Sequence, residues 1–213
     1  MENQIRQESH ENVERVPAPV RRPNVGAMSM DELRAEVARL GDELIRAEWQ
    51  IAELEARADV DPFLDIFNRR GFERELRRSL AFIQRYGAQA ALVFIDLDGF
   101  KDVNDRHGHA AGDGLLKQVA QTLTANVRAS DVVARYGGDE FAVLLWHIPE
   151  EQARLKARDL ERVIDATAIE QGGARLSVGA SAGMVPLTGG LEAGAAMEAA
   201  DRAMYARKRE RRG

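Results

Sequence analysis

The stretch VVARYGGDEFAVLLW, residues 132–146, places Gly137-Gly138-Asp139-Glu140 between two apolar runs. Both runs are predicted to be strands, and the glycine pair predicts a hairpin between them, because tight hairpin turns use positive φ angles. A turn alone does not explain two adjacent acids followed directly by an apolar strand. A turn without side chains also leaves space for the phosphates of a nucleotide to approach the backbone.

A second acidic pair ends another apolar run, FIDLDGFK at residues 94–101. Side chains alternate along a strand, so Asp96 and Asp98 point the same way for as long as the chain stays extended. Carboxylates at a strand end suit Mg²⁺, which proteins bind through one or two carboxylates together with substrate phosphates. An Asp-x-Asp pair by itself is also common at solvated strand ends, so it gains weight only in combination with other elements.

The chain from about residue 60 onward predicts an α/β fold, in which helices pack on a central β-sheet. Helical periodicity covers residues 68–86, 114–127, 149–170 and 191–209. The strand-like runs are Ala91–Ile95, Val132–Tyr136, Phe141–Trp146 and Leu176–Val185. No internal repeat is visible.

The N-terminal part divides into a polar tail and a helix with a heptad pattern. Residues 1–28 contain three prolines and no sustained periodicity, which predicts a flexible tail. Ser29 and Glu32 then form a capping-box pattern at the start of a helix. The heptad seam that follows consists of Leu33, Val37, Leu40, Leu44, Ala47, Ile51, Leu54 and Ala58.

This seam favours a parallel two-stranded coiled coil over residues 29–59. Two of its a positions hold β-branched residues, Val37 and Ile51, and most of its d positions hold leucine, which is the pattern of two-stranded coils. One amphipathic helix lying on the protein's own core is the alternative interpretation. Gly41 and two seam alanines weaken the coil, and Glu43 would face Glu48 across a parallel pair. We therefore expect a weak dimerisation helix.

Composition excludes several classes of protein. The 213 residues are 45% hydrophobic and 31% charged, and this length fits one globular domain plus an appendage. The formal net charge of −5 argues against non-specific nucleic-acid binding, which depends on positive charge. The absence of cysteine excludes disulfides and thiolate metal sites. The N-terminus lacks the apolar core of a secretory signal, and no stretch approaches the roughly 20 apolar residues that cross a bilayer. We expect a cytoplasmic protein that binds neither nucleic acid nor membrane.

Together these elements resemble the GGDEF domain family. Gly137–Phe141 spells the family signature, and three further family elements accompany it in the right order and spacing. They are DPFLDIFNRR at residues 61–70, DLDGFKDVNDRHGHAAGD at 96–113 and ADRAMY at 200–205. The resemblance covers residues 61–213 and implies a catalytic domain over residues 60–213, with a palm-like α/β fold similar to nucleotide cyclases.

The resemblance also implies an activity, the joining of two GTP molecules into cyclic di-GMP with release of two pyrophosphates. Two Mg²⁺ ions would act at each GTP site, with Mn²⁺ as a substitute. The implied metal ligands are Asp96, the carbonyl of Leu97, Asp139 and Glu140. The implied catalytic residues are Asp96, Asp139 and Glu140. Of these, Glu140 would help to deprotonate the attacking 3′-hydroxyl. The residues implied to bind guanine are Asn104 and Asp113. The residues implied to contact the phosphates are Gly99, Phe100, Lys101, Lys208 and Arg212.

The family works as a homodimer, because one domain holds one GTP and each 3′-hydroxyl attacks the other's α-phosphate. Arg128 and Asp131 match the family's inhibitory product site, an Arg-x-x-Asp five residues before the Gly-Gly turn, and Arg158 is a candidate third member. The alternative interpretation of this pair is a surface ion pair of little energetic value. The alternative function for the chain is a non-catalytic cyclic di-GMP receptor that signals through its coil, although such receptors usually lack the acids present here.

Two departures from the family pattern are visible. Phe63-Leu64-Asp65-Ile66 occupies the positions where the family has Leu-Thr-Gly-Leu, in a segment that couples the preceding helix to the domain. Arg211 and Gly213 occupy positions where the family often has Gly and Asn. Neither departure touches the implied catalytic residues.

Overall fold

The computed structural model of the protein describes residues 28–212, apart from the side chains of residues 51–57. The tail predicted for residues 1–28 therefore lies almost entirely outside the described residues. The described chain divides into two compact units between Trp49 and Gln50, and each is considered by itself.

The helix α1 (Met30–Ala58) begins with the predicted capping box. The backbone N–H of Ser29 donates to Glu32 Oε2 at 2.6 Å, and the backbone N–H of Glu32 donates to Ser29 Oγ at 3.3 Å. These two bonds satisfy amide groups that the first turn of a helix leaves without partners. The predicted helix start is therefore confirmed.

Most of the heptad seam of α1 is exposed where the structure describes its side chains, and Leu33 is half-buried. Val37, Leu40 and Leu44 are 70%, 48% and 61% exposed. Glu43, one of two acids expected to repel each other across a coil, forms an ion pair with Arg39 on its own helix. That pairing lessens the repulsion expected between Glu43 and Glu48 across a coil. The exposed Val37, Leu40 and Leu44 form an apolar stripe along the helix.

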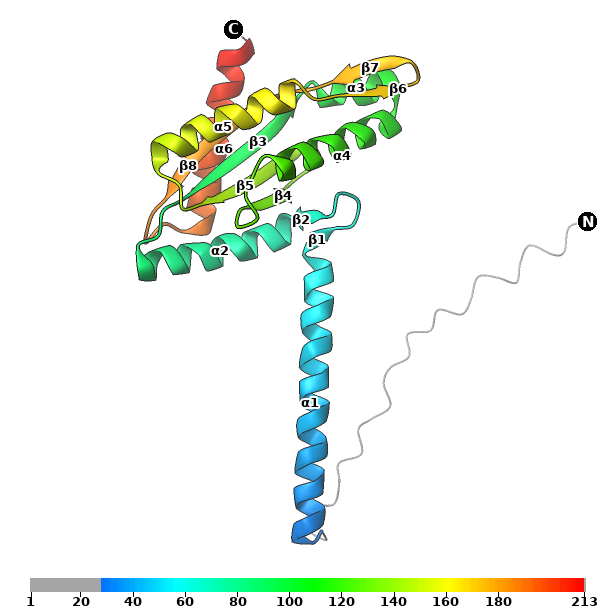
Figure 1. The fold of residues 1–213 in the computed structure, drawn as a ribbon, viewed down its shortest axis with the longest axis vertical. Coiled ribbons are helices and arrows are strands. Elements are labelled where there is room, and N and C mark those ends of the chain that lie inside the picture. Colours follow the sequence, from blue (N-terminus) through cyan, green and yellow to red (C-terminus); the bar gives the residue numbers. More distant parts are fainter. Residues whose placement is uncertain (1–27, 213) are drawn as a thin grey trace, which may run out of the picture. The chain divides into compact units, whose positions relative to one another are not determined.

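The larger unit is built on a six-stranded mixed sheet with the strand order β1-β2-β4-β5-β3-β8 (Figure 1). Only β2 and β4 pair in parallel, and the other neighbours are antiparallel. This arrangement confirms the predicted α/β class. The strands are β1 (Val60–Asp61), β2 (Ile66–Asn68), β3 (Ala90–Asp98), β4 (Val132–Arg135), β5 (Glu140–Trp146) and β8 (Gly179–Leu187).

Helices cover both faces of this sheet (Figure 1). One core lies between the sheet and α4 and α5, and a second core lies between the sheet and α2 and α6. None of the helices within residues 28–212 has the length and apolarity needed to span a bilayer. The helices of this unit are α2 (Arg69–Tyr86), α3 (Phe100–His107), α4 (His109–Ala125), α5 (Glu150–Asp165) and α6 (Ala193–Arg212).

Strand β3 is the centre of the fold because it is buried on both faces. Val93 and Ile95 contact the α4–α5 core, whereas Leu92 and Phe94 contact the α2–α6 core. Alternation of side chains along a strand sends successive residues to opposite faces, which explains why this run is apolar throughout. The strand stays extended to Asp98, so its two acids do lie on the same face, as predicted.

The segment after α5 differs from the sequence prediction. The helix expected to reach residue 170 ends at Asp165, and a two-stranded hairpin follows, β6 (Ala168–Gln171) and β7 (Ala174–Ser177). Its turn residues Gly172 and Gly173 both have positive φ, 59° and 77°. Apolar spacing extends the predicted helix over residues that form β6, and the glycine pair makes the tight turn from β6 to β7. Helix α3 was also not predicted.

The segment between α1 and α2 folds tightly onto α2. Asp59 is only 1% exposed and forms ion pairs with Arg70, at 2.8 Å, and with Arg74. The side-chain amide of Asn68 donates to the carbonyl of Ala58 at 2.8 Å. Asp59 is thus part of the folded domain, next to the predicted domain start at residue 60.

In the same segment, Asp65 has a φ of 54°. This is the left-handed region, which Asp tolerates better than most non-glycine residues. Asp65 stands where the family pattern has glycine, so the departure in sequence keeps the local backbone shape.

Candidate active site

Three predicted catalytic acids meet at one end of the central strands. Asp96 in β3 is the register partner of Glu140 in β5, and Asp139 directly precedes Glu140. The backbone N–H of Leu97 donates to the carbonyl of Asp139 at 3.1 Å, which fastens the turn before β5 to the end of β3. Strand pairing therefore brings together residues that lie more than 40 positions apart in the sequence.

The electrostatics of this cluster act mainly on Glu140. Burial raises the pKa of the Glu140 carboxyl above its usual value, and the charges of Asp96 and Asp139 raise it further. The two neighbouring acids favour the neutral form of Glu140, because like charges repel in a partly desolvated site. A site of this kind favours a bound cation. It also gives the Glu140 carboxyl a higher pKa than that of a free glutamate.

The hairpin turn before Glu140 is confirmed, but the predicted reason for its glycines is wrong. β4 and β5 pair antiparallel, and neither Gly137 nor Gly138 has a positive φ. A Cβ on Gly137 would instead collide with the Glu140 carboxylate, whereas the space beside Gly138 is open. A side chain at position 137 would therefore displace the Glu140 carboxylate from the place it takes over the turn.

Lys208 of α6 lies against the acids of β3. Its ammonium group forms an ion pair with Asp96 Oδ1 and lies 3.7 Å from Asp98 Oδ1. Arg212, which was grouped with Lys208 from the sequence, is exposed and forms no ion pair within the described residues. Arg211 approaches the site instead, with Nε 3.7 Å from Asp98 Oδ2.

The two residues predicted to read guanine lie on successive helices. Asn104 is in α3 and Asp113 is near the start of α4, and the backbone N–H of Gly108 between them donates to the carbonyl of Asn104 at 2.9 Å. The side-chain oxygen Oδ1 of Asn104 is buried without a hydrogen-bond partner, and Asp113 is exposed. A buried acceptor without a donor is costly, and a ligand N–H would satisfy it.

The residues predicted to contact phosphates begin helix α3. Gly99 precedes the helix with a φ of 79°, Phe100 is buried as an anchor, and Lys101 is exposed. The first turn of a helix presents unpaired backbone N–H groups and the positive end of the helix dipole. This helix start lies directly after the acids of β3, so it is placed to bind an anion beside them.

The donor set at the end of β3 fits a divalent cation that is shared with a substrate. Within residues 28–212, no group of three or more acidic or histidine side chains could hold a metal ion unaided. Asp98 Oδ1 is buried without a hydrogen-bond partner among the described residues, and Glu140 is under repulsion from three acids, Asp96, Asp139 and Asp201. Mg²⁺ usually takes one or two carboxylates and completes its shell with phosphates and water, which this arrangement matches.

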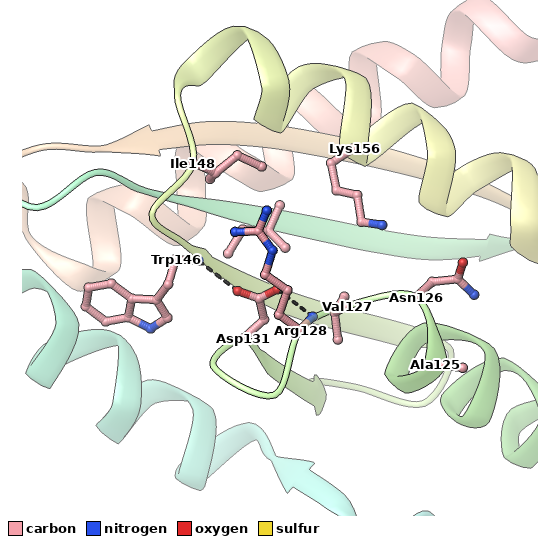
Figure 2. A pocket seen from close by; sticks show the side chains of 9 residues that line it. Ala125, Asn126, Val127, Arg128, Asp131, Trp146, Ile148 and Lys156 are labelled. Carbon is pink, nitrogen blue, oxygen red and sulfur yellow. Dashed lines mark hydrogen bonds between the residues drawn. The ribbon is translucent and has the colours of Figure 1, made fainter.

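A separate cavity of about 420 Å³ surrounds Arg128 (Figure 2). Arg128 comes from the loop after α4, and its side chain makes no hydrogen bond or ion pair within the described residues. Figure 2 shows Arg128 and Lys156 of α5 both extending toward this cavity. The other lining residues are Ala125, Asn126, Val127, Asp131, Leu145, Trp146 and Ile148.

Asp131 has a structural role in this cavity. Its Oδ2 accepts the backbone N–H of Arg128 and its Oδ1 accepts the backbone N–H of Trp146, both at 2.9 Å (Figure 2). The sequence left open a surface ion pair between Arg128 and Asp131, and these two described side chains form no such pair. Arg158, the candidate third member, does not line the cavity, whereas Lys156 does. Ala153 and Ala157 of α5 are buried, so helical spacing shows which face of α5 packs on the domain. That this places Lys156 at the cavity follows only from the fold.

The sequence matches the profile of the family described as "Diguanylate cyclase, GGDEF domain" over residues 58–213. The chain belongs to this GGDEF domain family. Diguanylate cyclases of the family depend on a metal. The fold and this family match confirm the resemblance drawn from the sequence.

Individual relatives give the same assignment. The chain is 42% identical over 165 residues to the probable diguanylate cyclase DgcE of Escherichia coli, covering 76% of this chain and 15% of that protein. It is 38% identical over 192 residues to the diguanylate cyclase TpbB of Pseudomonas aeruginosa, covering 86% and 41% of the two. The chain thus spans less than half the length of these curated relatives.

A solved structure that contains a coiled coil and a GGDEF domain matches most of the chain. The coiled coil and GGDEF domain of DgcB from Caulobacter crescentus, in complex with c-di-GMP, matches with a TM-score of 0.71 and 26% identity. The match covers 84% of this chain and 95% of that chain. That protein therefore provides a precedent for a GGDEF domain that follows a coiled-coil helix and binds the cyclic dinucleotide.

Proposed function

We propose that this chain is a cytoplasmic diguanylate cyclase, which condenses two GTP molecules into cyclic di-GMP. In each of two transfers, the 3′-oxygen of one GTP bonds to the α-phosphorus of the other, and the bond from that phosphorus to the pyrophosphate oxygen breaks. The 3′-hydroxyl proton passes to a base, and two pyrophosphates leave. The observation that carries this proposal is the convergence of Asp96, Asp139 and Glu140 beside Lys208.

The acids at the end of β3 and β5 would hold Mg²⁺, two ions for each GTP, with Mn²⁺ as a substitute. The ligands would be Asp96, Asp139, Glu140 and the carbonyl of Leu97. Bound there, the metal would lower the pKa of the 3′-hydroxyl and stabilise charge on the entering and leaving oxygens. Glu140 would accept the hydroxyl proton, a role that its raised pKa suits.

The nucleotide would be bound by its base and its phosphates. Asp113 would accept hydrogen bonds from N1–H and the N2 amino group of guanine, and the buried Asn104 Oδ1 supports a second contact to the base. The start of α3, formed by Gly99, Phe100 and Lys101, would receive phosphates. Lys208 and Arg212 would contribute positive charge from α6.

Incubation of the protein with GTP and Mg²⁺ tests this function directly. Nucleotides separated by chromatography and identified by mass should include cyclic di-GMP, with two pyrophosphates released for each one formed. The alternative is a receptor that binds cyclic di-GMP without making it. Binding of added cyclic di-GMP in a protein that forms none from GTP would favour the receptor.

The cavity around Arg128 would bind the product and inhibit the enzyme. The Arg128 side chain has no hydrogen-bond or ion-pair partner among the described residues and lies beside Lys156 in a cavity of about 420 Å³, so it is suited to guanine and phosphate oxygens. Asp131 would shape the loop through its two backbone hydrogen bonds and would not itself be the acceptor for guanine.

Arg128→Ala should relieve product inhibition without lowering the initial rate. The loss of a charged hydrogen-bonding group should weaken product binding by about ten-fold. Product accumulation over time, with and without added cyclic di-GMP, measures the effect. Arg154→Ala is the matched control, since Arg154 is on exposed α5 surface outside the cavity lining. Identical progress curves for Arg128→Ala and wild type would remove Arg128 from regulation.

Residues 29–59 would form a coiled coil that pairs two catalytic domains of residues 60–213, with residues 1–28 as a tail. The exposed stripe of Val37, Leu40 and Leu44 supports this proposal, since exposed apolar rows on a helix favour pairing. Pairing would hold two GTP sites at high effective concentration, which the reaction requires.

Leu44→Asp should make specific activity depend steeply on protein concentration, because a carboxylate in the seam opposes pairing. Removal of residues 1–58 should have the same effect, and at low concentration the loss should reach about 100-fold. Specific activity over a wide dilution series measures this effect. Ala38→Asp is the control, because it adds the same charge away from the seam. If the Leu44→Asp and Ala38→Asp series superimpose, the helix does not assemble the active site.

A further inference from the structure

Two acids of α5 cover the outer edge of the sheet. The backbone N–H of Ala182 donates to Glu161 Oε1 at 2.8 Å, and the backbone N–H of Ala180 donates to Asp165 Oδ1 at 3.0 Å. Both alanines belong to β8, which is the last strand of the sheet, so these N–H groups have no strand to pair with. Glu161 and Asp165 are four residues apart and share one helix face, which matches the two-residue spacing of the N–H groups on the strand.

The same two acids bind arginines of α6. Arg207 donates to both oxygens of Glu161, through Nε at 3.0 Å and Nη2 at 2.9 Å. Arg211 Nη2 lies 2.9 Å from both oxygens of Asp165. The arginines are also four residues apart, so two acids on α5 face two arginines on α6 in register. We call Glu161, Asp165, Arg207 and Arg211 the carboxylate–arginine ladder.

The ladder holds a part of α6 that apolar packing does not hold. The buried residues of this helix are Ala196, Ala200 and Met204, all before the ladder begins. There the helix approaches β8 so closely that a Cβ on Gly183 would collide with the backbone at Ala200 and Met204. Beyond Met204 the contacts are charged, and a C-terminal turn without anchors frays. The ladder therefore fixes the last two turns.

Lys208 lies within these two turns, next to Arg207. Its ammonium contacts Asp96 and Asp98, while Arg211 Nε lies 3.7 Å from Asp98 Oδ2. Asp98 is itself oriented by a hydrogen bond of 2.7 Å from Ser181 Oγ of β8. The edge strand, the ladder and the catalytic acids are thus one connected set of contacts. Glu161 is only 3% exposed, so it cannot relax into solvent if its partner is lost.

We propose that the carboxylate–arginine ladder is a positioning device, which places Lys208 where it meets the phosphates of GTP at the end of β3. This inference rests on the proposed function. The ladder residues act through Lys208 and need not touch the nucleotide. Loss of the ladder lets the end of α6 move away, so GTP binding weakens, while the acids that carry the chemistry are unchanged.

A double-mutant cycle with Lys208→Met tests this dependence. Asp165→Asn is the first ladder variant, because its side chain is 36% exposed and the amide oxygen still accepts the N–H of Ala180. Arg207→Met is the second variant. Each should raise the KM for GTP by about five-fold and leave kcat nearly unchanged, but should change KM by less than about two-fold when it is combined with Lys208→Met. The dissociation constant for 3′-deoxy-GTP, which cannot act as nucleophile, should follow the same pattern.

Arg209→Met is the matched control, since Arg209 is exposed on the same helix and forms no ion pair within the described residues. It should leave KM unchanged. Equal changes of KM in the wild-type and Lys208→Met backgrounds would overturn the inference, as would an unchanged KM in both ladder variants. If Arg207→Met does not fold, Asp165→Asn decides the result. A wild-type protein that neither binds GTP nor makes cyclic di-GMP would overturn the proposed function, and with it this inference.

Discussion

Turnover of the Glu140→Gln variant should fall by about 10²–10⁴-fold, the usual contribution of a positioned proton acceptor, while GTP binding largely survives. Asp96 and Asp139 remain to hold metal in this variant, and Lys208 still reaches the same strand end. The substitution removes only the charge beside the reacting 3′-hydroxyl. Initial rates of cyclic di-GMP formation, together with the dissociation constant for GTP, separate these two effects.

The stability of the same variant gives an independent check. In the folded protein the pKa of Glu140 is raised, so its contribution favours folding at low pH and is lost as the pH rises through the folded pKa. At neutral pH the ionised carboxylate therefore opposes folding, and Glu140→Gln should not lower the melting temperature. Glu192→Gln, at an exposed position on the surface, is the control for both measurements. Turnover near the wild-type rate would exclude Glu140 as the proton acceptor.

Asp113→Ala should abolish most of the preference for GTP over ATP. The preference should fall by about 10⁴-fold, because sites that hydrogen-bond a substrate's N–H groups discriminate to this extent. Adenine offers neither donor at the corresponding positions and would leave the carboxylate without a partner. Asp113 is exposed at the start of α4, so its removal should leave the core and the melting temperature unchanged.

The measurement is the ratio of kcat/KM for product formation with GTP and with ATP. Asp105→Ala serves as the control, since Asp105 is an exposed acid on the neighbouring helix α3. If Asp113→Ala keeps the wild-type preference, guanine is read by other residues, and the buried Asn104 Oδ1 is the next one to test.

The central part of the fold could be predicted because its signals are local. The apolar run of β3 and the glycine-containing hairpin between β4 and β5 are visible in short stretches, and their ends carry the acids of the site. The helix predicted to residue 170 was wrong beyond Asp165, and the hairpin that turns at Gly172-Gly173 with two positive φ angles was not predicted. The reason predicted for Gly137 was also wrong, because this residue has no positive φ and instead leaves room for the Glu140 carboxylate.

The surroundings of the acids could not be predicted, because they depend on contacts between distant segments. The partners of Arg207 and Arg211 lie 46 residues earlier in the chain, and the helical end that carries them reads as an ordinary solvated basic segment. Lys156 similarly reaches the cavity of Arg128 only through the packing of α5 on the sheet. Spacing within one helix identifies which side chains share a face but not what that face meets.

The covered edge of β8 also bears on self-association. An open edge strand is a template on which a strand from another chain can add, and such addition leads to aggregation. Here two backbone N–H groups on that edge are already bound by Glu161 and Asp165, which are themselves paired with arginines of α6. An approaching strand would have to displace these hydrogen bonds and ion pairs. This part of the β8 edge is therefore protected against strand addition from another chain.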